Sequence, residues 1–266
     1  MKANPNSNMK PSFKHNLKLS NRLQKIEKMV TSQYDHIWDC CCDHGLLGSA
    51  LLSRQAADTI HFVDIVPELM AEVENKLQRF YANKHSTSSL SWRTHCLDVA
   101  KLPLASYQGE HLIIIAGVGG DLMIKFIEAI YQQYKNLTID FLLCPVHHLY
   151  PLRSKLIELD FSLKDEMLVA DNRRFYEILL VSSASAADSK VNKKVSPVGD
   201  KIWQSQLTTD LTTDLALSSD EHSIKHPQAD IADKYLQKTL NHYQRIQQGK
   251  TNDVQHIIDA YRAVTL

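Results

Sequence analysis

The sequence has few of the residues that mark disulfide scaffolds and zinc sites. Only five of its 266 residues are cysteines, three of them consecutive at Cys40, Cys41 and Cys42, and no two have Cys-x-x-Cys spacing. This pattern excludes a disulfide framework and disfavours a metal site, because neighbouring residues of a strand point to opposite faces. We therefore predict reduced, buried thiols and no metal ion.

Long apolar runs and an excess of one charge are also absent. No run reaches the length of a membrane span, the N-terminus lacks the apolar stretch of a secretory signal, and 30 basic residues balance 30 acidic ones. We therefore expect a cytoplasmic globular enzyme with no membrane partner and no obligate protein partner. The first 28 residues nevertheless carry seven Lys or Arg against one acid, which fits either a phosphate-binding arm or a solvated tail.

Strand-like and helix-like runs alternate along most of the chain. An amphipathic helix capped by Ser20 comes first. Predicted strands then cover residues 37–39, 60–64, 90–96, 111–116 and 141–144, with helices that begin at Leu46, Pro67, Leu122 and Tyr150. This order indicates a parallel sheet with helices on both faces. The last two strands, 162–169 and 176–182, are joined by a turn so short that they form an antiparallel hairpin.

These elements predict an α/β fold with a Rossmann-like, seven-stranded sheet that is mostly parallel and ends in an antiparallel hairpin, plus a C-terminal helical appendage. We divide the chain into a flexible basic tail (1–18), the α/β domain (19–183), a flexible polar insertion (184–228) and a C-terminal helical hairpin (229–266). The apolar stripe of the C-terminal hairpin favours packing, either on the sheet or on RNA.

A carboxylate ends the first predicted strand, and a turn of small residues then opens a helix. The ligand-binding candidates in this turn are Asp39, Cys41, Asp43, His44 and Gly45. A dinucleotide fingerprint would place glycines where Cys41 and Asp43 stand, and carboxylates here repel a pyrophosphate. They suit a cationic or amine-bearing ligand. The alternative is a plain turn in which Asp43 only caps the helix.

The next two strands also end at acids. Asp64, followed by Ile65, lies one βαβ unit after Asp39, where a carboxylate can bind both hydroxyls of a ribose. Asp98, followed by Val99, comes just after the third strand and is either a further ligand contact or an Asx-turn residue.

The fourth strand ends at Ala116 and runs into a turn that holds Gly117, Gly119 and Gly120. Glycines at the mouth of a sheet let the backbone approach a ligand, although they also suit a simple tight turn. We group these glycines with His147 as candidate reaction-site residues. Candidates for contacts to a base or a phosphate are Arg22, His148, Tyr150, Arg153 and Arg174.

Four motifs together resemble one known family. They are Leu19-Ser-x-Arg22-Leu, Asp39-x-x-x-Asp43-His44-Gly45-x-Leu, Ile115-Ala-Gly117-x-Gly119-Gly120 and Phe175-Tyr176-Glu177-Ile178. In this order they resemble the bacterial tRNA (adenine(22)-N1)-methyltransferase family, and the terminal antiparallel hairpin is typical of class I methyltransferases. The resemblance implies S-adenosylmethionine as cofactor and tRNA as partner, with the acids of the first turn at the methionine end of the cofactor, Asp64 at the ribose and Asp98 at the adenine.

The sequence departs from the family pattern at three places. Cys41 stands where the family usually has glycine, Val118 replaces a common methionine, and Cys144-Pro145-Val146 replaces the usual Gln-Pro-Asn after the fifth strand. Two alternatives therefore stay open. One is a methyltransferase that acts on a small molecule or a protein, and the other is a catalytically silent RNA-binding protein on the same scaffold.

Overall fold

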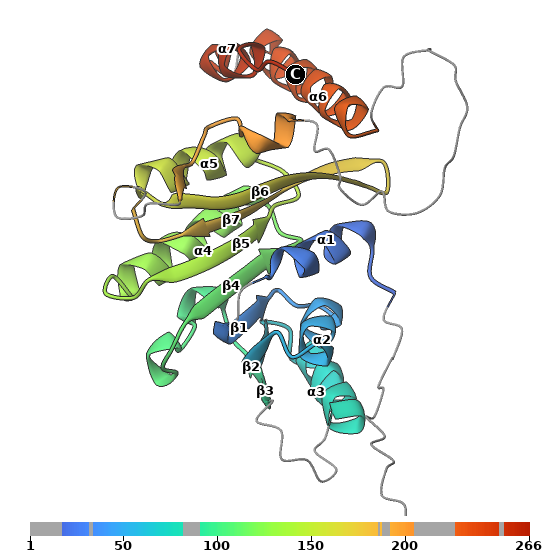
Figure 1. The fold of residues 1–266 in the computed structure, drawn as a ribbon, viewed down its shortest axis with the longest axis vertical. Coiled ribbons are helices and arrows are strands. Elements are labelled where there is room, and N and C mark those ends of the chain that lie inside the picture. Colours follow the sequence, from blue (N-terminus) through green and yellow to red (C-terminus); the bar gives the residue numbers. More distant parts are fainter. Residues whose placement is uncertain are drawn as a thin grey trace, which may run out of the picture.

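One twisted, mostly parallel sheet is the centre of the computed structural model, which describes residues 18–31, 34–81, 91–185, 187, 192–204, 227–249 and 253–266. The strand order is β3-β2-β1-β4-β5-β7-β6-β8 (Figure 1). The strands are β1 (Tyr34–Cys40), β2 (Ala57–Asp64), β3 (Ser91–Cys96), β4 (His111–Ala116), β5 (Ile139–Cys144), β6 (Ser162–Asp171), β7 (Arg174–Ser182) and β8 (Lys193–Lys194). Strands β1 to β5 are parallel, and β6, β7 and β8 pair antiparallel. The predicted parallel sheet with a terminal hairpin is confirmed.

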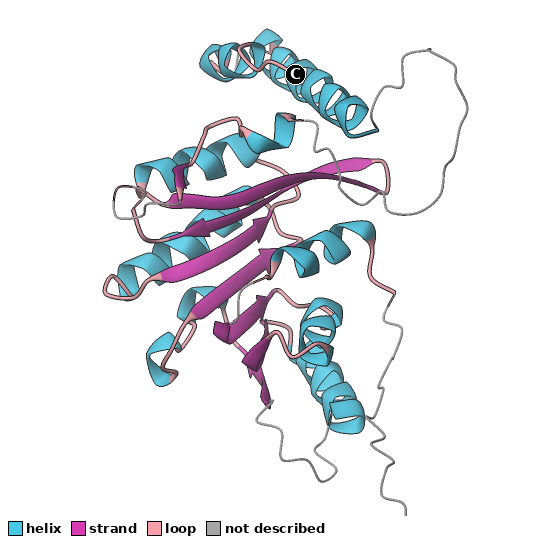
Figure 2. Cartoon of the chain, viewed as in Figure 1, coloured by secondary structure: helices cyan, strands magenta, loops and turns pink. Residues whose placement is uncertain are grey.

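Helices cover both faces of the sheet (Figure 2). They are α1 (Asn21–Met29), α2 (Leu46–Ser53), α3 (Pro67–Tyr81), α4 (Gly120–Gln133), α5 (Leu149–Glu158), α6 (Pro227–Gln248) and α7 (Gln255–Arg262). Helices α1, α2 and α3 bury Ile26, Leu51 and Val73 in one core, and α4 and α5 bury Ile127 and Leu152 in a second. Each helix buries one apolar stripe, as the sequence periodicity predicts.

Residues 192–204 pack on the α/β domain, although they fall within the stretch predicted as a flexible insertion. They form β8 and the short 3-10 helix η3 (Lys201–Trp203). Ile202 and Trp203 are buried, and the indole Nε1 of Trp203 donates to Val198 O over 2.9 Å. Most of the remaining insertion, and nearly all of the predicted basic tail, lie outside the described residues.

The C-terminal helices pack on the antiparallel end of the sheet (Figure 1). Leu236 of α6 and Tyr261 of α7 share an apolar cluster with Leu168 of β6 and with Trp203 of η3. The apolar stripe of α6 therefore contributes to packing. No helix in the described part of the chain is long and apolar enough to cross a bilayer.

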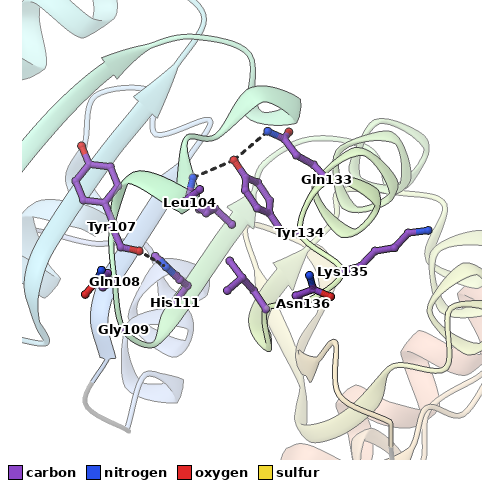
Figure 3. Close-up of a pocket in the computed structure, with 11 residues that line it drawn as sticks. Leu104, Tyr107, Gln108, Gly109, His111, Gln133, Tyr134, Lys135 and Asn136 are labelled. Carbon is purple, nitrogen blue, oxygen red and sulfur yellow. Dashed lines mark hydrogen bonds between the residues drawn. The ribbon is translucent and has the colours of Figure 1, made fainter.

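The connection from β3 to β4 contains two short 3-10 helices, η1 (Val99–Lys101) and η2 (Leu104–Ser106). Tyr134, just after α4, anchors it: the hydroxyl donates to Leu102 O over 2.5 Å and accepts from Leu104 N over 3.1 Å. Figure 3 shows this tyrosine beside a hollow of about 460 Å³, where His111 Nε2 lies 3.1 Å from Tyr107 O. The Tyr134 hydroxyl also accepts a hydrogen bond from Gln133 Nε2 over 3.0 Å.

Three histidines form a hydrogen-bonded row across β1, β2 and β3. His36 Nδ1 lies 3.1 Å from His61 Nε2, and His61 Nδ1 lies 2.9 Å from His95 Nε2. The ring of His61 stacks on Trp38, with 3.7 Å between the ring centroids. Burial, followed by the neighbouring charges of His95 and His36, lowers the pKa of His61 to about 2. Burial also lowers the pKa of His95, so the neutral imidazole is favoured at His61 and at His95.

We predict that His61 makes the fold less stable in acid. A histidine in the unfolded chain has a pKa of about 6.5. Below that pH, His61 is therefore protonated in the unfolded chain but stays neutral in the folded protein. The contribution of His61 to the free energy of unfolding should therefore fall as the pH drops below about 6.5, by up to about 1.4 kcal/mol per pH unit. Asp39, whose pKa is raised by burial, contributes with the opposite sign over this range, so a His61 variant is needed to isolate the histidine. Urea unfolding between pH 7.5 and pH 5 measures this slope. His61→Phe should reduce it, and an identical slope in both proteins would contradict the prediction.

Candidate active site

A cleft of about 390 Å³ opens where β1 and β4 end. Because these parallel strands are neighbours, the turns that follow them face each other across the sheet edge. The residues that line the cleft are Arg22, Leu23, Asp39, Cys41, Cys42, Asp43, His44, Leu46, Leu47, Ala116, Gly117 and Val118. The structure thus brings together three groups of predicted residues. They are most of the turn after β1 (residues 39–45, the acidic turn), the start of the turn after β4 (residues 117–120, the glycine turn) and the predicted RNA contact Arg22.

Asp39 lies at the floor of this cleft and is 4% exposed. Its Oδ2 accepts a hydrogen bond from Gly48 N over 2.8 Å. Burial raises the pKa of Asp39 to about 7, the Gly48 bond opposes this shift, and the charge of Asp64 adds to it. A carboxylate this close to its titration point favours a bound cation, because a positive charge offsets the cost of burying its charge.

The turn after Asp39 contains three residues in the left-handed region. Cys41 has φ 57°, Asp43 has φ 51° and Gly45, which precedes α2, has φ 67°. Cys41 thus occupies a backbone conformation that glycine adopts without strain. Its thiol is surrounded by acids: burial, then the charges of Asp64, Asp39 and Asp98, raise its pKa to about 12. A neutral thiol is therefore expected at this position.

Asp64 joins the acidic turn to the end of β2. Its Oδ2 accepts from Asp43 N over 3.2 Å, and its Oδ1 accepts from Val66 N over 3.1 Å. The adjacent Ile65 is 66% exposed, so an apolar side chain projects from the same edge of the sheet. An acid with a flanking exposed apolar residue suits a sugar and a heterocyclic ring.

Asp98 caps the 3-10 helix η1. Its Oδ1 accepts from Ala100 N over 2.9 Å, and the adjacent Val99 is buried. One of the two interpretations from the sequence, an Asx-type turn residue, therefore describes the backbone here. The cap uses Oδ1, and it does not conflict with a ligand contact through Oδ2.

The glycine turn packs against the loop that follows β5. A Cβ at Gly119 would lie 2.3 Å from His147 Cε1, and a Cβ at Gly120 would lie 2.3 Å from His148 O. Gly120 N donates to His147 O over 3.0 Å. Gly117, with φ 86°, is different: its would-be Cβ meets nothing within 4 Å, and the residue lines the cleft. Gly117 thus lines the cleft, whereas Gly119, Gly120 and His147 lie outside its lining and pack the glycine turn against the loop after β5.

Arg153, predicted to contact a base or a phosphate, is fully buried, so that prediction is wrong. Its Nε donates to Glu177 Oε2 over 2.8 Å and its Nη2 to Glu166 Oε2 over 2.7 Å. The other oxygen of Glu177 accepts from Tyr235 Oη of α6 over 2.6 Å. The guanidinium therefore joins α5 to the hairpin β6–β7, and Glu177 joins that hairpin to α6.

The remaining predicted substrate contacts lie around the same edge. His148 is exposed, has φ 60° and places Nδ1 2.5 Å from Asp121 Oδ2. The ring of Tyr150 packs near His256 of α7, with 5.8 Å between centroids. Arg174 is exposed at the start of β7. The sequence analysis missed Tyr176 as a site residue, although its Phe-Tyr-Glu-Ile motif was noted: the Arg22 guanidinium lies 5.0 Å from the centre of that ring.

Among the described residues, no group of three or more His, Cys, Asp or Glu side chains is placed to hold a metal ion. The sheet order, the terminal hairpin and an acidic cleft at the carboxyl ends of the parallel strands define a Rossmann-like α/β domain of the methyltransferase type. Residues 19–179 match the family model described as a methyltransferase domain. The chain therefore belongs to this methyltransferase-domain family.

Solved structures share this fold over 63% to 92% of the chain. TrmK of M. capricolum, in complex with S-adenosyl-homocysteine, has 14% identity and a TM-score of 0.62, covering 92% of this chain and 96% of that chain. The B. subtilis M1A22 tRNA methyltransferase TrmK has 19% identity and a TM-score of 0.60, covering 92% and 94%. Streptococcus pneumoniae Sp1610, in complex with S-adenosyl-L-methionine, has 20% identity and a TM-score of 0.53, covering 63% and 74%. No curated protein matches the sequence.

We predict that Gly48→Ala destabilises the protein, although alanine is the better helix former. In an unconstrained helix this change stabilises by up to about 1 kcal/mol. Here the new Cβ would lie 2.4 Å from Phe62 Cε1 and 2.9 Å from Asp39 Oδ2, so the free energy of unfolding should fall by about 1–3 kcal/mol. Urea unfolding measures it, with Ser49→Ala in the same helix as the control. A stabilised Gly48→Ala protein would contradict this packing.

The buried arginine gives a second prediction. Arg153→Ala leaves Glu166 and Glu177 buried without their cation, which should cost about 3–5 kcal/mol of unfolding free energy. Arg174→Ala, at an exposed position, should change it by less than about 0.5 kcal/mol. Equal effects in the two variants, measured by urea unfolding, would refute the structural role assigned to Arg153.

Proposed function

We propose that this protein transfers a methyl group from S-adenosylmethionine to N1 of an adenine in tRNA. The observation that carries the proposal is the acidic cleft at the ends of β1 and β4, on a fold shared over 92% of the chain with the two TrmK proteins. We propose a cytoplasmic reaction that needs no membrane and no obligate protein partner.

The side chains of the cleft, together with the acids at the ends of β2 and β3 that lie outside its lining, suit such a donor. Asp39 and Asp43 can bind a cationic methionine end, Asp64 can bind ribose hydroxyls, and Asp98 can accept a hydrogen bond from an adenine amino group. Gly117 leaves the cleft open at its mouth. When bound, S-adenosylmethionine supplies an electrophilic methyl group on a sulfonium.

The protein's share of catalysis is then alignment and the exclusion of water. Methyl transfer to N1 is an in-line displacement, so most of the rate comes from holding the acceptor nitrogen opposite the methyl group. Adenine N1 already carries a lone pair, so no strong base is required. Backbone carbonyls near Gly117 can stabilise the cationic product base as it forms. N1 lies on the Watson–Crick edge, so the target base must be unpaired or flipped out.

We predict that Asp64→Ala weakens donor binding. A charge-assisted hydrogen bond contributes about 1.5–3 kcal/mol, so the dissociation constant should rise about tenfold or more. Isothermal calorimetry with S-adenosylmethionine measures it. Asp58→Ala, which removes an exposed acid of the same strand, is the control. Unchanged affinity in Asp64→Ala would refute the ribose assignment.

Incubation with labelled S-adenosylmethionine and total tRNA, followed by nucleoside analysis, tests the whole proposal. Label recovered as 1-methyladenosine supports it. Donor binding without label in tRNA would favour a small-molecule or protein substrate. Absence of donor binding by calorimetry, with retained binding of tRNA, would favour a catalytically silent RNA-binding protein. The last two outcomes both overturn the proposed activity.

A further inference from the structure

Arg22 is held in a fixed position at the edge of the cleft. Its backbone N–H donates to Asp171 Oδ2 over 3.1 Å, which ties the start of α1 to the turn between β6 and β7. Its guanidinium lies over the ring of Tyr176, 5.0 Å from the centroid. A stacked guanidinium loses less conformational entropy when it binds a ligand, because its plane is already oriented.

One nitrogen of this guanidinium, Nη1, has no hydrogen-bond acceptor among the described residues. It is also buried. A buried donor without an acceptor costs about 1–3 kcal/mol. Because Arg22 lines the cleft, an acceptor on a bound ligand would remove this cost.

The charges around the cleft identify the chemistry of that acceptor. Of the described residues that line it, Asp39 and Asp43 are acids and Arg22 is the one arginine or lysine. The neighbouring Cys144 thiol, which hydrogen-bonds to the Arg22 side chain, offers no counter-charge, because burial raises its pKa to about 11 even though the charge and the hydrogen bond of Arg22 lower it. A ligand that fits this cleft therefore carries a positive group for the acids and a separate negative group for Arg22.

We propose that Arg22 binds the carboxylate of the amino-acid end of the methyl donor, an inference that rests on the proposed function. The amino-acid end is a zwitterion, whose ammonium suits the acids and whose carboxylate suits a guanidinium. The position of Arg22 in the lining of the cleft favours this ligand over an RNA phosphate, because an amino-acid carboxylate enters a cleft of about 390 Å³ whereas a polyanionic backbone stays at the surface. This role replaces the RNA contact that the sequence suggested for Arg22.

A cycle of paired ligands and variants tests the pairing directly. The probes are S-adenosylmethionine and its decarboxylated form, which lacks only the carboxylate, and the readout is the dissociation constant from calorimetry without RNA. The unaltered protein should bind the decarboxylated form about 10- to 100-fold more weakly. In Arg22→Gln the two ligands should bind within about twofold of each other, with S-adenosylmethionine weakened and the decarboxylated form nearly unaffected.

Two further variants keep the result interpretable. Arg22→Lys retains the charge and should preserve part of the preference for the carboxylate. Lys28→Gln removes one positive charge from an exposed position of the same helix and should leave both affinities unchanged. Circular dichroism of each variant reports whether the fold is retained.

The outcomes separate this inference from the proposed function. Equal weakening of both ligands in Arg22→Gln would overturn the carboxylate assignment and leave a packing role. A loss of tRNA affinity with unchanged donor binding would overturn it in favour of an RNA contact. If the unaltered protein binds neither ligand, the proposed function itself fails. If it binds the donor but Arg22→Gln does not change the preference for the carboxylate, only the role of Arg22 is overturned.

Discussion

The adjacency of β1 and β4 is the constraint on which the site depends. Two strands, β2 and β3, separate them along the chain, yet β1 and β4 lie side by side in the sheet (Figure 1). The chain leaves β1 toward one face and β4 toward the other, so their following turns diverge and leave a crevice. The polar side chains of the acidic turn and the open backbone at Gly117 meet there because the sheet order reverses at this point.

A buried ionic cluster connects the antiparallel end of the sheet to the C-terminal helix α6. Arg153 pairs with Glu166 and Glu177, and Glu177 also accepts the hydroxyl of Tyr235. The second oxygen of Glu166 accepts two backbone N–H groups, from Asp200 and Lys201. Buried ion pairs contribute little net stability, but they accept few alternative geometries. We infer that this cluster fixes how α6 and η3 sit against β6 and β7.

Much of the fold could be predicted from the sequence because its signals are local. Acids at strand ends, such as Asp39 and Asp64, can be recognised within a few residues of sequence. The same is true of the apolar stripes of helices. The position of Arg153 could not be predicted, since its partners come from two strands that lie beside it only in the folded protein. Trp203 was missed for a related reason: a few buried side chains in a polar stretch do not make a periodic pattern.

The row of histidines has a consequence for where its protons lie. His36 Nε2 is 3.1 Å from the backbone oxygen of Gln108, and a carbonyl only accepts, so Nε2 carries the proton and Nδ1 is left to accept. His61 must then donate through Nε2, and His95 must do the same. One carbonyl in the β3–β4 connection thus dictates the tautomer of three rings, and a change in the path of that connection would alter protonation two strands away.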